Sequence, residues 1–176
     1  MKGAAAISST LLLFFACTGT GRSQPPTSPS GTVPAGWLTY SDATFGFALA
    51  YPNEFGIVPE SEPPPGGALR RVRFLEAEIV GGQFADLEPP RFTVAVFALG
   101  QSATLADWAR SAGRLPRDAT TTPVDLAGAR EGLRIQLSLQ MAPNDFFYFR
   151  TDQYVYALTP LGLHSAEMLD SFRLIR

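Results

Sequence analysis

The sequence is poor in the residues that most often carry chemistry. Its 176 residues include one cysteine, one histidine and one lysine, at Cys17, His164 and Lys2. Beyond residue 17 there is no thiol, which excludes disulfides, zinc–thiolate sites and a cysteine nucleophile from the rest of the chain. Charge is sparse and nearly balanced, with 14 basic residues against 16 acidic ones. This balance gives no reason to expect a nucleic-acid partner.

Long apolar runs are also missing. The only extended one, residues 3 to 16, is too short for a membrane-spanning helix, which needs about 20 apolar residues. It follows Met1 and Lys2 and ends just before Cys17, and this order of a positive start, an apolar middle and a small residue is typical of a secretory signal. Residues 18 to 36 are rich in Gly, Pro, Ser and Thr, so we expect a flexible linker there.

Ala16 and Cys17 resemble the end of the lipobox of bacterial lipoproteins, although the two preceding phenylalanines depart from the usual leucine and small residue. The resemblance implies that residues 1 to 17 are a lipoprotein signal peptide ending at the lipobox cysteine, and that the sulfur of Cys17 carries diacyl lipid such as palmitate. Each buried methylene adds about 0.8 kcal/mol to membrane partitioning, so two or three chains form a nearly permanent anchor. The alternative is an ordinary signal peptide with an incidental cysteine.

The lipobox resemblance also implies a location. The protein would be lipid-anchored at the cell membrane or the outer membrane and would face the periplasm or the exterior. Thr18 stands where an aspartate is the usual signal for retention in the inner membrane.

Residues 37 to 176 are long enough for one domain with its own core. Short apolar runs predict strands at WLTY and FGFALAYP around an SDAT turn, at residues 69–80 and 92–99, and in two hairpins, TPVDL with REGLRIQLSL and FFYFR with YVYALTP. LADWARSAGRL predicts a helix with Thr104 as its N-cap, and HSAEMLDSFRLI predicts a helix that runs into an extended end. Strands joined by short turns, with two inserted helices, predict an α+β fold with an antiparallel sheet.

Four stretches, YSDATFGFALAYPNEF, LADWA, VDLAGAREG and MLDSFRLI, resemble the PsbP-like domain family, which includes the extrinsic PsbP subunit of photosystem II and a Ran-binding import factor. The resemblance covers nearly all of residues 37 to 176. It implies an α/β/α sandwich whose antiparallel sheet has about six strands. Many relatives have a tryptophan shortly after Tyr-Pro, where this chain has Phe55, an aromatic that can fill the same packing role. The resemblance further implies a binding or assembly role and no enzymatic activity.

The densest basic cluster consists of Arg70, Arg71 and Arg73, just after a loop rich in proline and glycine. Arginine side chains bind phosphate and carboxylate groups in pairs, so these three residues are the binding candidates. The alternative is that they pair across strands with acids such as Glu76 or Glu78.

No residue is assigned a catalytic role or a metal. His164 has Ser165 and Glu167 nearby in sequence, but adjacent residues of a helix point in different directions, and the Gly-x-Ser-x-Gly motif is missing. Glu76 and Glu78 alternate as they would on one strand face, yet no calcium-loop motif accompanies them. We interpret them as part of a solvated strand face.

The sequence therefore predicts a membrane-anchored lipoprotein that acts as a non-enzymatic binding or assembly module of the cell envelope. It would be held at the membrane by lipid on Cys17 and would dock an envelope protein through a sheet edge or through the loops at residues 59–68 and 81–91. The alternative is a small-molecule or metal-ion carrier with a pocket between sheet and helices. No cofactor is expected.

Overall fold

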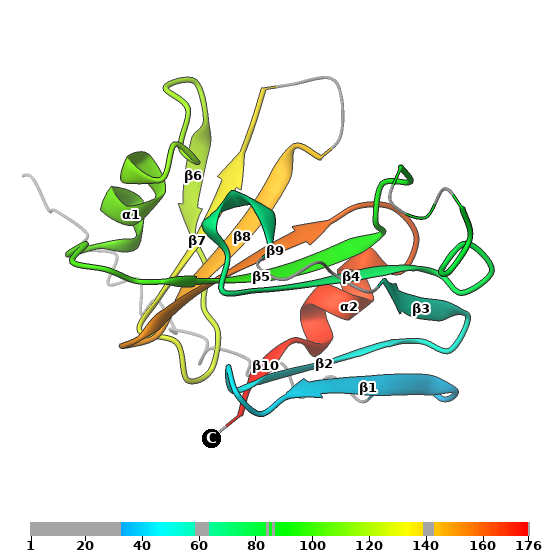
Figure 1. The fold of residues 1–176 in the computed structure, drawn as a ribbon. Helices are drawn as coiled ribbons and strands as arrows, with labels where there is room; N and C mark the ends of the chain where they lie inside the picture. The colour runs from blue at the N-terminus through cyan, green and yellow to red at the C-terminus, as the bar shows by residue number, and fades with distance from the viewer. Residues whose placement is uncertain (1–32, 59–63, 84, 86, 139–142, 176) are drawn as a thin grey trace, which may run out of the picture.

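The computed structural model describes residues 33–58, 64–83, 85, 87–138 and 143–175 (Figure 1). The predicted signal peptide with Cys17 and most of the predicted linker lie outside the described residues. The first strand begins at Trp37, where the sequence predicts that ordered structure starts. In the described part of the chain, no helix is both long and apolar enough to span a membrane.

Two antiparallel sheets make up the fold. The smaller one has the order β1-β2-β10, with β1 at Trp37–Asp42, β2 at Phe47–Pro52 and β10 at Arg173–Leu174. In Figure 1 it runs below the larger sheet, and α2 (Ser165–Ser171) lies between the two. The last strand of the chain thus pairs with one of the first.

The larger sheet has seven strands in the order β3-β4-β5-β9-β8-β7-β6. Every neighbouring pair in it is antiparallel. The bounds are β3 Phe55–Val58, β4 Arg70–Glu76, β5 Phe92–Ala98, β6 Thr120–Pro123, β7 Glu131–Gln136, β8 Asp145–Arg150 and β9 Tyr154–Pro160. A 3-10 helix, η1, occupies Pro65–Gly67 before β4.

The predicted α+β class with an antiparallel sheet is confirmed. The larger sheet has seven strands where about six were expected, and its strands differ from the expected ones in three places. The strand expected over residues 69–80 ends at Glu76, because the amides of Ile79 and Val80 turn back to the Glu76 carbonyl. The strand expected at TPVDL lies two residues earlier, at β6. β3 is an additional strand that the sequence pattern did not predict.

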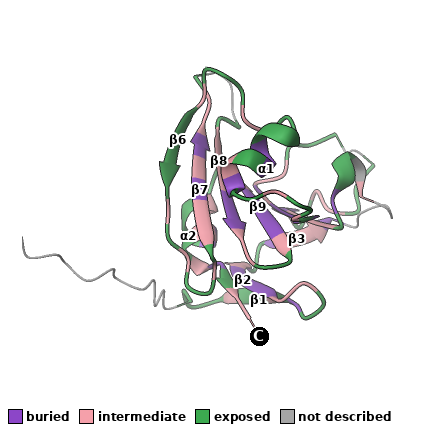
Figure 2. Ribbon diagram, turned by 90° about the vertical axis from the view of Figure 1, so that its left-hand side faces the viewer, coloured by how far each residue is buried: buried purple, intermediate pink, exposed green. Residues whose placement is uncertain are grey.

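Each face of the larger sheet carries one helix, as the α/β/α expectation requires. Successive residues of β5 point to opposite faces of the sheet. Val94 and Val96 pack in the core that contains Met168 of α2. Ala95 packs on the other face, in the cluster that contains residues of α1 (Leu105–Ser111). Figure 2 shows that the solvent side of α1 is exposed and that β6 is exposed along its length.

Helix α1 begins as predicted but ends early. The Thr104 side chain accepts a hydrogen bond from the Asp107 amide at 3.1 Å, which makes Thr104 the N-cap. The helix stops at Ser111 because Gly113 adopts a left-handed conformation with φ of 67°.

Aromatic side chains form the core between the two sheets. Phe172 stacks on Phe47 at 5.8 Å and on Phe149 at 6.2 Å between ring centroids. Phe55 is buried in the same cluster, in the packing role expected of it. The Tyr156 hydroxyl donates to the Phe45 carbonyl at 2.7 Å and so links the larger sheet to the turn between β1 and β2.

Candidate functional site

A groove of about 500 Å³ lies on the outer face of the larger sheet, the face that also carries α1. We name it the outer groove. Its lining comes from four strands and from three connections beside them: Arg71, Arg73, Leu87, Glu88, Pro89, Pro90, Thr93, Pro143, Phe146, Thr159 and Leu161.

The strand register places the side chains that line the bottom of the outer groove next to one another. Arg73 pairs with Thr93, and Thr93 pairs with Thr159, so three neighbouring strands place these side chains on one face. Further along the same face, Ala95 and Phe97 are covered by α1. The outer groove is thus the part of this face that α1 leaves uncovered.

The outer groove contains both basic and apolar side chains. Arg71 and Arg73 are two residues apart on β4, so their Cα atoms are about 7 Å apart along the strand; both side chains already take part in interactions within the protein. Phe146 is half-buried, and Leu87 is 77% exposed at the rim, next to the acidic Glu88. A lining that combines arginine forks with exposed apolar carbons is typical of a protein-binding surface.

Arg70, the third binding candidate, does not belong to the outer groove. It lies on the opposite face of β4, where its Nε lies 3.1 Å from the Asp42 carboxylate and its guanidinium donates to the Tyr40 hydroxyl at 3.2 Å. The hydrogen bond with Tyr40, together with the Asp42 charge and against the effect of burial, raises the pKa of Arg70. The structure therefore divides the predicted cluster, and Arg70 joins the two sheets.

The two glutamates do not form the strand face expected of them. Glu76 is the last residue of β4, whereas Glu78 lies in the turn that follows. Burial opposes ionisation of Glu76, but the hydrogen bond from Arg91 at 2.7 Å and the Arg91 charge hold the pKa of this carboxyl below its ordinary value. Glu76 therefore pairs with Arg91 and not with an arginine of β4.

His164 has an acid beside it but no adjacent nucleophile. Its Nε2 lies 3.5 Å from Glu54 Oε1, and its ring packs edge-on against Trp37. The Ser165 hydroxyl instead donates to the Gly162 carbonyl at 2.7 Å. His164 adopts φ of 60°, a left-handed conformation just before α2, and its side chain makes no capping hydrogen bond to the helix.

Another pocket of the described residues is smaller than the outer groove. It lies between β8 and α2 and is lined by apolar side chains such as Phe149, Leu169 and Phe172, and its volume of about 140 Å³ is well below the size usual for a ligand site. No group of three or more histidine, cysteine or acidic residues suited to a metal occurs in the part of the chain that the structure describes.

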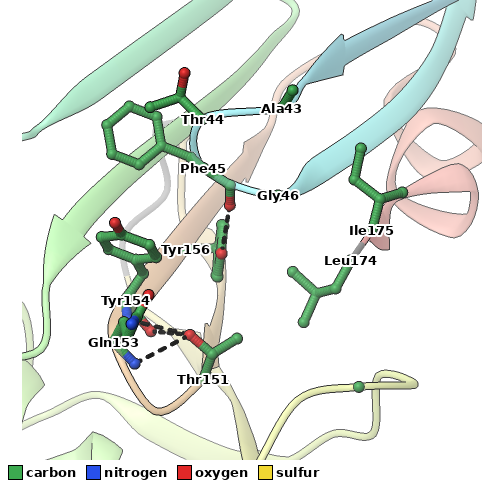
Figure 3. A pocket seen from close by; sticks show the side chains of 11 residues that line it. Ala43, Thr44, Phe45, Gly46, Thr151, Gln153, Tyr154, Tyr156, Leu174 and Ile175 are labelled. Atoms are coloured by element: carbon green, nitrogen blue, oxygen red, sulfur yellow. Dashed lines mark hydrogen bonds between the residues drawn. The ribbon is translucent and has the colours of Figure 1, made fainter.

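A second pocket, of about 330 Å³, lies at the junction of the two sheets. We name it the junction pocket. Figure 3 shows the rings of Phe45 and Tyr154 on one side of it and the side chains of Leu174 and Ile175 on the other. Its walls come from the β1–β2 turn at residues 43–46, the β8–β9 turn and the end of the chain after α2, which is why no local sequence pattern indicated it.

Sequence comparisons identify no relative: no protein-family model matches the chain, and no curated protein matches it. Among solved structures, the chain is similar to the solution structure of cyanobacterial PsbP (CyanoP) from Synechocystis sp. PCC 6803. The identity is 14%, the match covers 86% of this chain and 99% of that one, and the TM-score is 0.46.

This comparison concerns the fold and assigns no activity or binding residue to the chain. The chain is an α+β protein with an antiparallel seven-stranded sheet and flanking helices.

Proposed function

We propose that this chain is a non-enzymatic binding or assembly module, tethered to a membrane of the cell envelope by lipid on Cys17, and that it docks a partner protein through the outer groove. The observation that carries the proposal is the outer groove itself. The outer groove is the part of this sheet face beside β4 that α1 leaves open, and its lining combines two arginines with exposed apolar side chains.

A protein partner fits this lining better than a small ion does. Leu87, Pro89 and Pro90 offer apolar surface that an inorganic anion could not use, whereas a protein surface would bury it. The arginines add positive charge to the lining and therefore favour a partner surface that carries carboxylates. The loop at residues 81–91, one of the predicted docking loops, supplies this part of the rim.

Catalysis has little support from the same geometry. The hydroxyl of Ser165 is committed to the Gly162 carbonyl and cannot be activated by His164 in this arrangement. The His164–Glu54 pair therefore has no nucleophile from α2, and a binding role remains the better explanation of the chain.

Site-specific crosslinking tests the docking surface. A photo-crosslinking residue would replace Leu87 in the lipidated protein within its native envelope, and a matched protein would carry it at Leu38, which is 47% exposed on β1. We expect one defined protein adduct from position 87, identified by mass spectrometry, and none from position 38. Leu87→Asp should remove that partner from a pull-down, whereas Leu38→Asp should retain it, and both should unfold at the parent temperature.

Equal adducts from both positions, or no adduct from position 87, would contradict docking at the outer groove. The tether is tested separately by mass spectrometry of the mature N-terminus. We expect a peptide that begins at Cys17 with diacyl lipid on its sulfur, and a Cys17→Ala protein that no longer fractionates with membranes. An unmodified Cys17 would overturn the anchor without affecting the docking test.

A further inference from the structure

The junction pocket differs from the outer groove in place and in chemistry. The junction pocket lies at the N-terminal end of β9, at Tyr154, whereas the outer groove lies near the C-terminal end of β9, at Thr159. None of the residues that line it carries a charge. A charged ligand would lose hydration there without gaining a partner of opposite charge, so the lining selects for neutral molecules.

Two of the polar side chains in the junction pocket form hydrogen bonds within the protein that fix the position of its walls. The Tyr156 hydroxyl donates to the Phe45 carbonyl at 2.7 Å. The Thr151 hydroxyl accepts from the Tyr154 amide at 3.1 Å and so fixes the β8–β9 turn (Figure 3). The position of the tyrosine wall is therefore set by the protein's own hydrogen bonds before any ligand arrives.

Two of the other polar side chains at the pocket remain for a ligand. Within the described residues, the structure gives no hydrogen-bond partner to the side chains of Thr44, Gln153 or Tyr154. The Gln153 amide and the Tyr154 hydroxyl can donate as well as accept, whereas the Thr44 hydroxyl points away from Leu174 and Ile175 (Figure 3). Leu174 and Ile175 form an aliphatic wall opposite Gln153 and Tyr154.

We propose that the junction pocket binds a small neutral molecule built on a hydroxylated ring. The ring would lie between the aromatic and the aliphatic wall, and its hydroxyl groups would bond to Gln153 and Tyr154. A volume of about 330 Å³ is at the lower end for ligand pockets, which limits the ligand to one or two rings. Saccharides and phenols share this chemistry.

The test is a titration of the full chain carrying Cys17→Ala with glucose and, separately, with phenol. Binding is monitored through the chemical shifts of the backbone amides in NMR spectra. We expect saturable shifts confined to residues 43–46, 151–156 and 174–175 with at least one probe. Glucuronate and benzoate, the charged counterparts, should bind at least about ten-fold more weakly because the pocket offers no counter-charge.

Variants locate the site. Gln153→Ala and Tyr154→Phe each remove one hydrogen-bonding group and should weaken binding of the active probe about five-fold. Gln101→Ala changes another exposed glutamine, between β5 and α1, and should leave binding unchanged. The proposal is overturned if neither probe saturates, if the shifts map elsewhere, or if the charged counterparts bind equally well. None of these outcomes bears on the outer groove.

Discussion

Asp42 should be the most sensitive polar position of the fold. Its carboxylate is only 8% exposed and is the one buried charged group among the described residues. One carboxylate oxygen accepts from the amides of Thr44 and Phe45, both at 3.1 Å, and the other lies 3.3 Å from the Tyr40 hydroxyl and 3.1 Å from Arg70 Nε. Asp42 thus fixes the β1–β2 turn and joins the two sheets.

The size of the effect follows from these contacts. A hydrogen bond to a charged group contributes about 1.5–3 kcal/mol. Asp42→Ala removes the acceptor of two turn amides, and because Thr44 is exposed, water can replace part of the loss. We expect the free energy of unfolding to fall by about 3 kcal/mol. Asp42→Asn keeps an acceptor for the amides and weakens mainly the pairing with Arg70, which is 40% exposed, so we expect a loss of about 1 kcal/mol.

Urea denaturation of the full chain with Cys17→Ala measures both values. The two tryptophans report on different parts of the fold, since Trp37 lies in β1 and Trp108 in α1. The control is Asp152→Ala, which removes a carboxylate that is 71% exposed and should change stability by less than about 0.5 kcal/mol. The reasoning is refuted if Asp42→Ala is as stable as the control, or if Asp42→Asn loses as much as Asp42→Ala.

Two further predictions concern strand packing and pH. Gly132→Ala should lower the free energy of unfolding by about 3 kcal/mol, because its Cβ would clash with the Val124 carbonyl oxygen. In Gly67→Ala the alanine would have a strained backbone conformation but no close neighbour, so the free energy of unfolding should fall by only about 1–2 kcal/mol. Equal losses for the two variants in urea titrations would contradict the close packing at Gly132. The pKa of Glu76 is lowered, so its pairing with Arg91 stabilises the folded protein fully at pH values above 4.5, the ordinary pKa of a glutamate. This stabilisation is lost as the pH falls through the lower pKa that Glu76 has in the folded protein. Glu76→Gln and Arg91→Gln should therefore each flatten the loss of stability on acidification, and an unchanged pH dependence in either would contradict the pairing.

Local features of the fold could be predicted because the residues that cause them are adjacent in sequence. The SDAT turn is fixed by Asp42, whose side chain bonds to amides two and three residues later. Thr104 caps α1 through the Asp107 amide three residues on. Such short-range hydrogen bonds leave a signature in the order of the residues, and the structure contains them where the sequence predicts them.

Other features depend on contacts between distant residues, and no local pattern reports these. β3 is only four residues long and contains Gly56, so its strand pattern is weak. The neighbours of Arg73 in the outer groove come from strands β5, β8 and β9. The junction pocket brings the turn at residues 43–46 against Leu174, more than a hundred residues away. Predicting either site requires the strand order.

The division of the arginine cluster shows how the core determines the binding surface. On β4, Val72 and Phe74 are buried between the two sheets, and residues of a strand alternate between faces. Burial of these two side chains therefore forces Arg71 and Arg73 onto the outer face and Arg70 onto the inner one. A shift of one residue in the pairing would bury two arginines and expose Val72 and Phe74. The charge of the outer groove is thus fixed by apolar side chains that never reach it.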